Sequence, residues 1–413
     1  MLTKLIAGMA VLPFVAFAQP AIAQTELSVF HAFASHSPWQ EELAARYTAA
    51  NPGATFAFQV PGETYDDALV TVIRQSMTDE TPDIYMVGAH LLPALVARGL
   101  VQPIDDLLAG ADLVAEGYAP ETLEMAKVDG TLYGLPWTSS TPVTFFNADL
   151  VTQAGGDPAN LPKDWDGMIA LAGKIDALGP DIIGMYWETG TDDWMTQNLL
   201  RSNAVSMMSD DGTTLGIDSA EGVAAIDLFR RFHTEGGQEP IDQPAARQQM
   251  YAGQMGFYFV STAAVRSFKR EIGDRFVWGT APIPVAPDGG VVSGGMVAVI
   301  LTSDPAQRQA AFNYIRFGTS AESQAFVVEN TGYMPVNIGA MPMLETFYAA
   351  NPAWKTSVSQ IATSTPWFAW PGPDGVRISQ LVVDHMTALA NGQTDSAATV
   401  QAMTAGIKGL LPE

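Results

Sequence analysis

Arg377 is the residue whose type and setting most clearly suggest chemistry. A guanidinium group binds phosphate through paired N–H donors, which a lysine cannot reproduce. Arg377 follows a glycine- and proline-rich stretch that begins at Gly372, in a chain with only 20 basic residues against 44 acidic ones. This setting favours an anion-binding arginine. A surface arginine, or an arginine paired with Asp374, is the alternative interpretation.

Small hydroxyl side chains form a second group of candidates. Ser139 and Ser140 precede an aromatic strand-like stretch, and Ser261 follows the apolar residues 257–260. Serine hydroxyls can donate to phosphate or sugar oxygens without steric cost. Ser261 also lies where it would cap a predicted helix at residues 263–270, whose free N–H groups attract anions. Ordinary turn and cap chemistry is the alternative for these serines.

Glycines and aromatic side chains supply candidates of a different kind. Gly294 and Gly295 would let a ligand approach the backbone closely, although a strand bulge explains them as well. Tyr333 could stack on a ligand and hydrogen-bond to it, unless it is a half-buried structural residue. Trp367 and Trp370 could pack on polyols, sugars or quaternary amines, but the usual place of a tryptophan is the core.

Several other kinds of chemistry find no support in the sequence. The chain has no Cys, which excludes disulfides and thiolate sites. Its five His residues lack metal-motif spacing, and there is no nucleophile elbow or phosphate-binding loop, so we predict no metal and no cofactor. Asp192-Asp193 and Asp210-Asp211 are acidic pairs in turn-like contexts. A secreted hydrolase with paired carboxylates is a distant alternative.

The first 23 residues have the pattern of a secretory signal peptide. Lys4 precedes an apolar run at residues 5–18, and small residues occupy the −3 and −1 positions before Gln24. The run is too short for a permanent membrane helix, which needs about 20 apolar residues. We therefore expect export, removal of residues 1–23 and a location in a bacterial periplasm.

The composition is that of a globular chain long enough for two domains, with 47% hydrophobic and 15% charged residues. A net charge of −24 disfavours nucleic acid and anionic membrane surfaces as partners. Strand and helix patterns alternate along the chain, and the alternation predicts an α/β fold with a largely parallel sheet. The predicted strands include residues 25–31, 55–60, 83–87, 182–186 and 255–260, and the predicted helices include residues 39–50, 65–77, 164–178, 220–235, 305–318 and 321–329.

Four ordered segments resemble the family 1 extracellular solute-binding proteins of ABC importers: residues 135–147, 293–296, 330–335 and 372–377. Within that family the chain is most similar to the sn-glycerol-3-phosphate-binding subgroup, over essentially its whole mature length. The resemblance implies a two-lobed periplasmic-binding-protein fold of the α/β class, with a hinge and an interlobe ligand cleft. It also implies hinge closure around a ligand, delivery to the transmembrane subunits of an ABC permease, and no catalysis.

The same resemblance assigns roles to individual residues. The subgroup's phosphate-contacting arginine corresponds to Arg377, and a ligand-contacting serine corresponds to Ser261. Tyr65 matches a binding-site tyrosine, and Trp187 matches the aromatic residue at the glycerol end. With the family match, we also expect a ligand contact from Ser139 or Ser140.

The sequence departs from the subgroup at two positions. The subgroup holds the glycerol hydroxyls with acidic residues, and those positions are Ala34 and Ala89 here, with His36 and His90 nearby. A carboxylate accepts hydroxyl donors, whereas alanine accepts none. The departure favours a different phosphorylated or phosphodiester head group, or a larger glycan.

The family pattern also predicts how the chain divides. We expect an N-terminal lobe of residues 24–137 plus 288–336 and a C-terminal lobe of residues 138–287 plus 337–413. The predicted ligand is a phosphorylated glycerol derivative held by Arg377, Ser140, Ser261 and the Gly295 backbone, and a neutral mono- or oligosaccharide is the runner-up. We expect a monomer with no nucleic-acid partner.

Overall fold

The computed structural model describes residues 25–78, 80–189, 192–209 and 212–412. The predicted signal peptide, residues 1–23, and the acidic pair Asp210-Asp211 lie outside the described residues. Among the helices described, none is both long enough and apolar enough to cross a bilayer.

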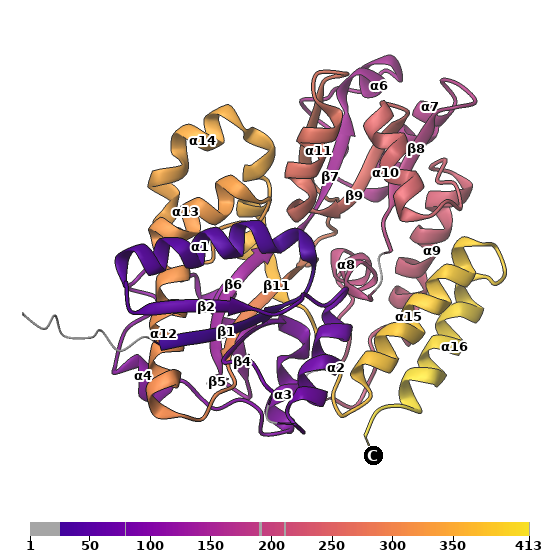
Figure 1. Ribbon diagram of the computed structural model, residues 1–413. Helices are drawn as coiled ribbons and strands as arrows, with labels where there is room; N and C mark the ends of the chain where they lie inside the picture. The colour runs from indigo at the N-terminus through magenta and orange to yellow at the C-terminus, as the bar shows by residue number, and fades with distance from the viewer. Residues whose placement is uncertain (1–24, 79, 190–191, 210–211, 413) are drawn as a thin grey trace, which may run out of the picture.

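Two sheets form the centres of two α/β lobes, which lie side by side in Figure 1. The first sheet has six strands in the order β12-β11-β3-β1-β2, with β6 also paired to β11. The second has four strands in the order β10-β7-β9-β8. The first sheet consists of β1 (Thr25–His31), β2 (Ala54–Phe58), β3 (Ile84–Gly88), β6 (Gly134–Ser140), β11 (Val291–Ile300) and β12 (Ser364–Pro366). The second consists of β7 (Pro142–Asn147), β8 (Ile183–Trp187), β9 (Met255–Ser261) and β10 (Trp278–Pro282).

The prediction of a largely parallel sheet holds for the three strands from which it was made, but the complete first sheet is mixed. β1 pairs in parallel with β2 and β3, as strands joined by helices should. β11, however, is antiparallel to both β3 and β6, and the second sheet is also mixed. All ten residues of β11 are buried, so this long returning strand forms the centre of its sheet.

Helices cover both sheets, and most begin where the sequence predicted (Figure 1). Side-chain caps explain these starts: Asp164, Ser219 and Asp304 accept hydrogen bonds from backbone N–H groups of the first turns of α7, α9 and α12. The first lobe carries α1 (Ser37–Ala50), α2 (Tyr65–Gln75), α3 (Leu92–Ala97), α4 (Asp105–Leu108), α5 (Pro120–Leu123), α12 (Pro305–Gly318) and α13 (Ala321–Asn330), besides a small hairpin of β4 (Lys127–Val128) and β5 (Thr131–Leu132). The second carries α6 (Ala148–Gln153), α7 (Trp165–Asp176), α8 (Trp194–Ser202), α9 (Ala220–Thr234), α10 (Gln243–Ala252), α11 (Val265–Ile272), α15 (Gly375–Ala390) and α16 (Ser396–Lys408).

Short 3₁₀ turns connect several of these elements. One segment, made of three such turns and the helix α14 (Glu345–Ala350), joins the lobes. Residues between α13 and β12 pack against the four-stranded sheet, where Leu344, Tyr348 and Trp354 join its core. The segment comprises η5 (Ile338–Leu344), α14 (Glu345–Ala350), η6 (Pro352–Lys355) and η7 (Ser357–Thr363). The other 3₁₀ turns are η1 (Ala34–His36), η2 (Ala89–Leu91), η3 (Glu124–Ala126) and η4 (Thr262–Ala264).

The chain passes between the sheets through a buried hydroxyl network. Thr141 separates β6 from β7, and its Oγ1 lies 2.9 Å from Ser357 Oγ. Gln360 donates to Thr141 Oγ1 at 2.7 Å, and Thr262 also hydrogen-bonds to Ser357. The predicted lobe boundaries stay a proposal. β12 differs from them, since it lies in the segment assigned to the C-terminal lobe yet pairs with β11 of the first sheet.

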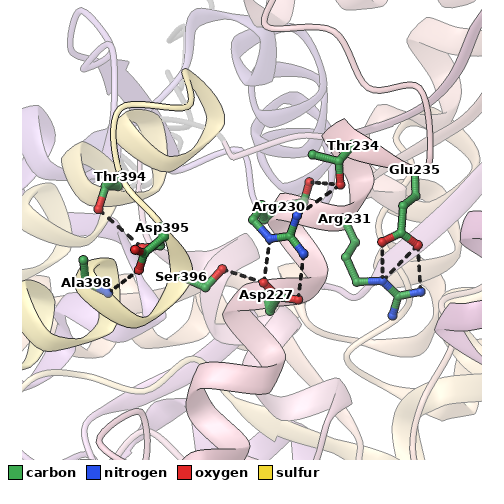
Figure 2. A network of polar contacts seen from close by, with 9 residues as sticks. All are labelled: Asp227, Arg230, Arg231, Thr234, Glu235, Thr394, Asp395, Ser396 and Ala398. Carbon is green, nitrogen blue, oxygen red and sulfur yellow. Dashed lines mark hydrogen bonds and ion pairs between the residues drawn. The ribbon is translucent and has the colours of Figure 1, made fainter.

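A terminal helical hairpin, α15 and α16, was not predicted from the sequence. Figure 2 shows how α16 is attached to α9: Ser396 donates to Asp227 at 2.8 Å, and Arg230 pairs with the same carboxylate. Asp395 caps α16 by accepting from the N–H of Ala398 at 2.8 Å. These contacts fix the hairpin on the second lobe.

Candidate ligand-binding site

Aromatic side chains from both lobes meet between the two sheets. The His90 ring, in the turn after β3, stacks on the Trp367 ring, directly after β12, with centroids 3.5 Å apart and planes 19° apart. Tyr65, the first residue of α2, lies 6.0 Å from the His90 ring and 6.3 Å from the Trp367 ring. The set contains Phe33, His36, Tyr65, His90, Trp194, Tyr333 and Trp367, and we call it the interlobe cluster.

His36 and Tyr333 form another contact of the interlobe cluster. The Tyr333 hydroxyl lies within hydrogen-bond distance, 3.3 Å, of His36 Nε2, and the two rings are 5.8 Å apart. Thr331 positions Tyr333 by accepting a hydrogen bond from its backbone N–H. The predicted site residues Tyr65, His36, His90 and Tyr333 are therefore brought together, from segments nearly 300 residues apart.

The two histidines of the interlobe cluster are neutral. Burial lowers the pKa of His36 to about 3, with a smaller effect of His31, and burial lowers the pKa of His90 to about 3. A neutral imidazole both donates and accepts hydrogen bonds but carries no positive charge. These residues can therefore hold hydroxyl or amide groups but supply no countercharge for an anion.

Three carboxylates lie beside the interlobe cluster, and we call them the acidic trio: Asp66, Asp192 and Asp193. Asp193 accepts hydrogen bonds from the indole N–H groups of Trp367, at 3.1 Å, and Trp370, at 2.7 Å. Burial, and then the charge of Asp193, raises the pKa of Asp192 to about 7 and that of Asp66 to about 6. Two of the three carboxyls are thus partly protonated near neutral pH.

The sequence analysis missed the acidic trio as part of a site. It noted Asp192-Asp193 but assigned the pair to a turn, and it did not single out Asp66. Asp66 is on α2 in the first lobe, and Asp193 immediately precedes α8 in the second. Only the packing of the two lobes brings them together, so no local pattern could have indicated it.

The predicted serines lie at the crossing between the sheets. Ser261 donates to Ser140 with an Oγ–Oγ distance of 2.9 Å and accepts from the N–H of Ala263, which confirms its predicted role as a cap. Ser139 is fully buried, and its hydroxyl finds no partner among the described residues. Its carbonyl accepts from Met334, next to Tyr333. The serines therefore adjoin the interlobe cluster.

The glycine pair has packing roles in this structure. A Cβ on Gly295 would lie 2.1 Å from the Thr138 carbonyl oxygen, and its φ is +138°. A Cβ on Gly294 would lie 3.1 Å from the Trp194 indole. Gly295 thus allows β11 to approach β6, and Gly294 makes room for Trp194 of the interlobe cluster. A ligand approach to this backbone stays a prediction.

Comparison with known proteins places this arrangement in a family. The family model described as bacterial extracellular solute-binding protein matches residues 42–356. The chain belongs to this family of solute-binding proteins. Binding proteins of the family bind small polar ligands and deliver them to ABC permease subunits, so this chain is the substrate-binding component of an ABC importer. The resemblance inferred from the four sequence segments is confirmed.

The solute-binding protein has relatives with named ligands. It is 24% identical over 362 residues to the sn-glycerol-3-phosphate-binding periplasmic protein UgpB of Escherichia coli (strain K12), covering 83% of this chain and 80% of the relative. It is 25% identical over 340 residues to a protein of Brucella abortus (strain 2308) that carries the name of a binding protein, covering 81% of this chain and 80% of the relative.

Solved structures with the same fold have been crystallised with different ligands. UgpB from Mycobacterium tuberculosis, in complex with glycerophosphocholine, superposes with a TM-score of 0.83 at 20% identity, covering 94% of this chain and 98% of that chain. The GacH receptor of Streptomyces glaucescens, also solved in complex with acarbose, has a TM-score of 0.80 at 16% identity, with the same coverage. These similarities confirm the predicted two-lobed α/β fold.

Arg377 does not join the interlobe cluster in this solute-binding protein. Its side chain is 69% exposed and pairs with Asp374 at 2.8 Å, in the first turn of α15. This matches the alternative stated for it from the sequence. Two residues further on, Ser379 accepts from the backbone N–H of Asp193, so the first turns of α15 do reach the acidic trio.

Trp187 lies in the hydrophobic core of the second lobe. It is fully buried among Trp165, Phe232 and Phe259, the usual place of a tryptophan. Its ligand contact stays a prediction that no neighbour in the interlobe cluster supports. Trp194 and Trp367 supply the indole rings there instead, and the sequence analysis named only the second of them.

Proposed function

We propose that this solute-binding protein captures a phosphorylated glycerol derivative, glycerol-3-phosphate or a glycerophosphodiester, between its two lobes. The observation that carries the ligand class is the similarity to UgpB of Escherichia coli across most of the chain. The fold of the glycerophosphocholine-bound UgpB, matched over 94% of the chain, supports the same class.

The contacts around α15 support a place for the phosphoryl group. Arg377 lies in the first turn of a 16-residue helix, where free N–H groups and the helix dipole favour anions. Its partner Asp374 is a surface carboxylate, and exposed ion pairs of this kind contribute only about 0–1 kcal/mol. Arg377 can therefore exchange Asp374 for a ligand phosphate at low cost.

A neutral mono- or oligosaccharide is the second candidate, and the composition of the interlobe cluster favours it. The cluster and the acidic trio combine aromatic faces and carboxyls, which suit sugars, and their histidines are neutral. Within the described part of the chain, neither set contains a lysine or arginine. The two candidates therefore differ in whether Arg377 takes part in binding.

Substitution of Arg377 separates the two ligands. We expect Arg377→Ala to weaken binding of glycerol-3-phosphate and glycerophosphocholine by about tenfold or more, the effect of losing one charge-assisted contact. Isothermal titration calorimetry of the exported protein, with maltose included in the ligand panel, measures this.

Arg270→Ala is the matched control for that experiment. Arg270 is as exposed as Arg377 and pairs with its neighbour Glu271 on α11. It should leave all affinities unchanged. Tight binding of maltose that neither substitution alters, with no binding of phosphoesters, would exclude the phosphorylated ligand and keep the importer role.

We further propose that the protein is not an enzyme and acts in the periplasm after loss of residues 1–23. The named relatives are binding proteins and belong to an extracellular family, which supports both points. Nuclear magnetic resonance of ligand released from the protein should return the starting compound. Hydrolysis products in that spectrum would favour the secreted hydrolase.

A further inference from the structure

Four polar atoms in or near the acidic trio are buried and find no hydrogen-bond partner among the described residues. They are Asp66 Oδ1, Tyr85 Oη, His90 Nδ1 and Trp194 Nε1. The Tyr85 side chain is 0% exposed and that of Trp194 is 7% exposed, so these two groups have no access to bulk water. A buried polar group without a partner costs about 1–3 kcal/mol, and such groups usually have a ligand or water to meet.

The four residues come from both lobes and are linked through shared neighbours. Tyr85 is on β3, against which α2 with Asp66 packs, and the Asp66 charge acts with burial to raise the pKa of Tyr85. His90 lies in the turn at the end of β3 and stacks on Trp367, whose ring centroid is 6.4 Å from that of Trp194. Trp194 is joined to the acidic trio, because its backbone N–H donates to Asp192 at 3.1 Å.

The donor and acceptor types of these atoms restrict what can satisfy them. Trp194 Nε1 only donates, an ionised Asp66 only accepts, and Tyr85 Oη and His90 Nδ1 can do either. A phosphate would satisfy the donors but be repelled by the carboxylates. An ammonium group would satisfy the acceptors but leave the indole unpaired. Hydroxyl groups donate and accept at once, so adjacent hydroxyls on one ligand can satisfy the whole set.

We propose that Asp66, Tyr85, His90 and Trp194 form a hydroxyl-binding subsite that takes a vicinal diol of the ligand. The proposal rests on the proposed function, in which the ligand is a glycerol derivative. Asp66 then supplies a carboxylate in place of those missing at Ala34 and Ala89, from another position in the sequence. Tyr85 and Trp194, which the sequence analysis did not single out, become specificity-determining residues.

Tyr85→Phe tests the subsite by removing one atom. The hydroxyl has no partner in the free protein, so its loss should not lower the melting temperature. The affinity for glycerol-3-phosphate should fall by about tenfold, the equivalent of about 1.4 kcal/mol. Trp194→Phe, which keeps an aromatic ring but removes the N–H donor, should have a similar effect on affinity.

Tyr314→Phe is the matched control. Tyr314 is also 0% exposed in the same core, and its hydroxyl also finds no partner in the described part of the chain. It differs from Tyr85 in that burial alone raises its pKa, with no contribution from Asp66. Tyr314→Phe should leave the affinity unchanged and should not lower the melting temperature. A second arm compares glycerol-3-phosphate with propyl phosphate, which lacks both hydroxyls. The wild type should prefer glycerol-3-phosphate, and Tyr85→Phe should reduce that preference.

The outcomes distinguish the subsite from the ligand class. Wild-type affinity in both Tyr85→Phe and Trp194→Phe would overturn the subsite. A lower melting temperature for Tyr85→Phe than for Tyr314→Phe would also overturn it, because the hydroxyl would then have a structural partner. Binding of a saccharide alone, weakened by Tyr85→Phe, would exclude the phosphorylated ligand and retain the subsite.

Discussion

At the scale of single residues, the acidic trio and the interlobe histidines make stability depend on pH in opposite directions. The raised pKa values of Asp66 and Asp192 mean that their stabilising contribution is complete below about pH 4 and is lost as pH rises toward 6–7. The lowered pKa values of His36 and His90 mean that the stabilising contribution of these histidines is present above about pH 6.5 and is lost as pH falls toward 3.

Asp192→Asn should isolate the acidic contribution. Asp192 is affected by Asp193, Asp66 and Glu188, and an amide oxygen can still accept from Trp194. We expect the free energy of unfolding of the variant to be about 2 kcal/mol higher than that of the wild type at pH 8. At pH 4 the two free energies of unfolding should be equal. Urea denaturation at the two pH values measures this.

Asp384→Asn is the control, because Asp384 is an exposed carboxylate on α15. It should not alter the difference between the two pH values. Equal stabilities of Asp192→Asn and the wild type at pH 8 would show that Asp192 ionises in the folded protein without cost.

At the scale of elements, the contact between β6 and β11 depends on a residue without a side chain. Gly295→Ala would place a methyl group against the Thr138 carbonyl in a left-handed backbone conformation. We expect a loss of about 3 kcal/mol in the free energy of unfolding, since clash and strain add. Thermal denaturation by circular dichroism checks this.

Gly409→Ala provides the comparison. Gly409 ends α16, and a Cβ added there would lie 3.5 Å from its nearest neighbour, the Gly406 carbonyl oxygen, so a methyl group should be tolerated. A Gly295→Ala protein as stable as the wild type would mean that β11 can shift relative to β6.

Elements with strong local patterns could be predicted from the sequence, whereas strand pairing could not. Alternation and caps located β1, α7, α9 and α12 to within a few residues. The antiparallel position of β11 depends on contacts between distant residues, such as Met296 with Thr138, which are 158 positions apart. The same limit applies to the site. Tyr65 and His90 were singled out through family resemblance and Tyr333 through the chemistry of its side chain, but Asp66, Tyr85 and Trp194 were found only through packing.

At the scale of the whole molecule, Trp367 connects the two lobes. It follows β12 of the first sheet, stacks on His90 after β3, and donates to Asp193 before α8 of the second lobe. Aromatic pairs contribute about 0.5–1.5 kcal/mol beyond the area that they bury. Trp367→Ala removes this stack and the hydrogen bond to Asp193. We expect the lobes to separate more in the absence of ligand, with a larger radius of gyration by small-angle X-ray scattering.

Trp278→Ala is the control for lobe separation, because Trp278 stacks on Phe145 within the second lobe. It should leave the radius of gyration as in the wild type. An unchanged radius for Trp367→Ala would mean that the crossing network around Thr141 and Ser357, rather than the stack, holds the lobes together.

The strand order of the six-stranded sheet has a consequence for how such proteins diversify. The sheet combines β1, β2, β3 and β6 with β11 and β12, while β7 to β10 lie in the other sheet. A single genetic crossover anywhere between β3 and β11 would therefore combine strands from two parents within one sheet. Whole lobes therefore cannot be exchanged between relatives by a single crossover, which favours point substitutions and loop changes as the routes to a new solute preference.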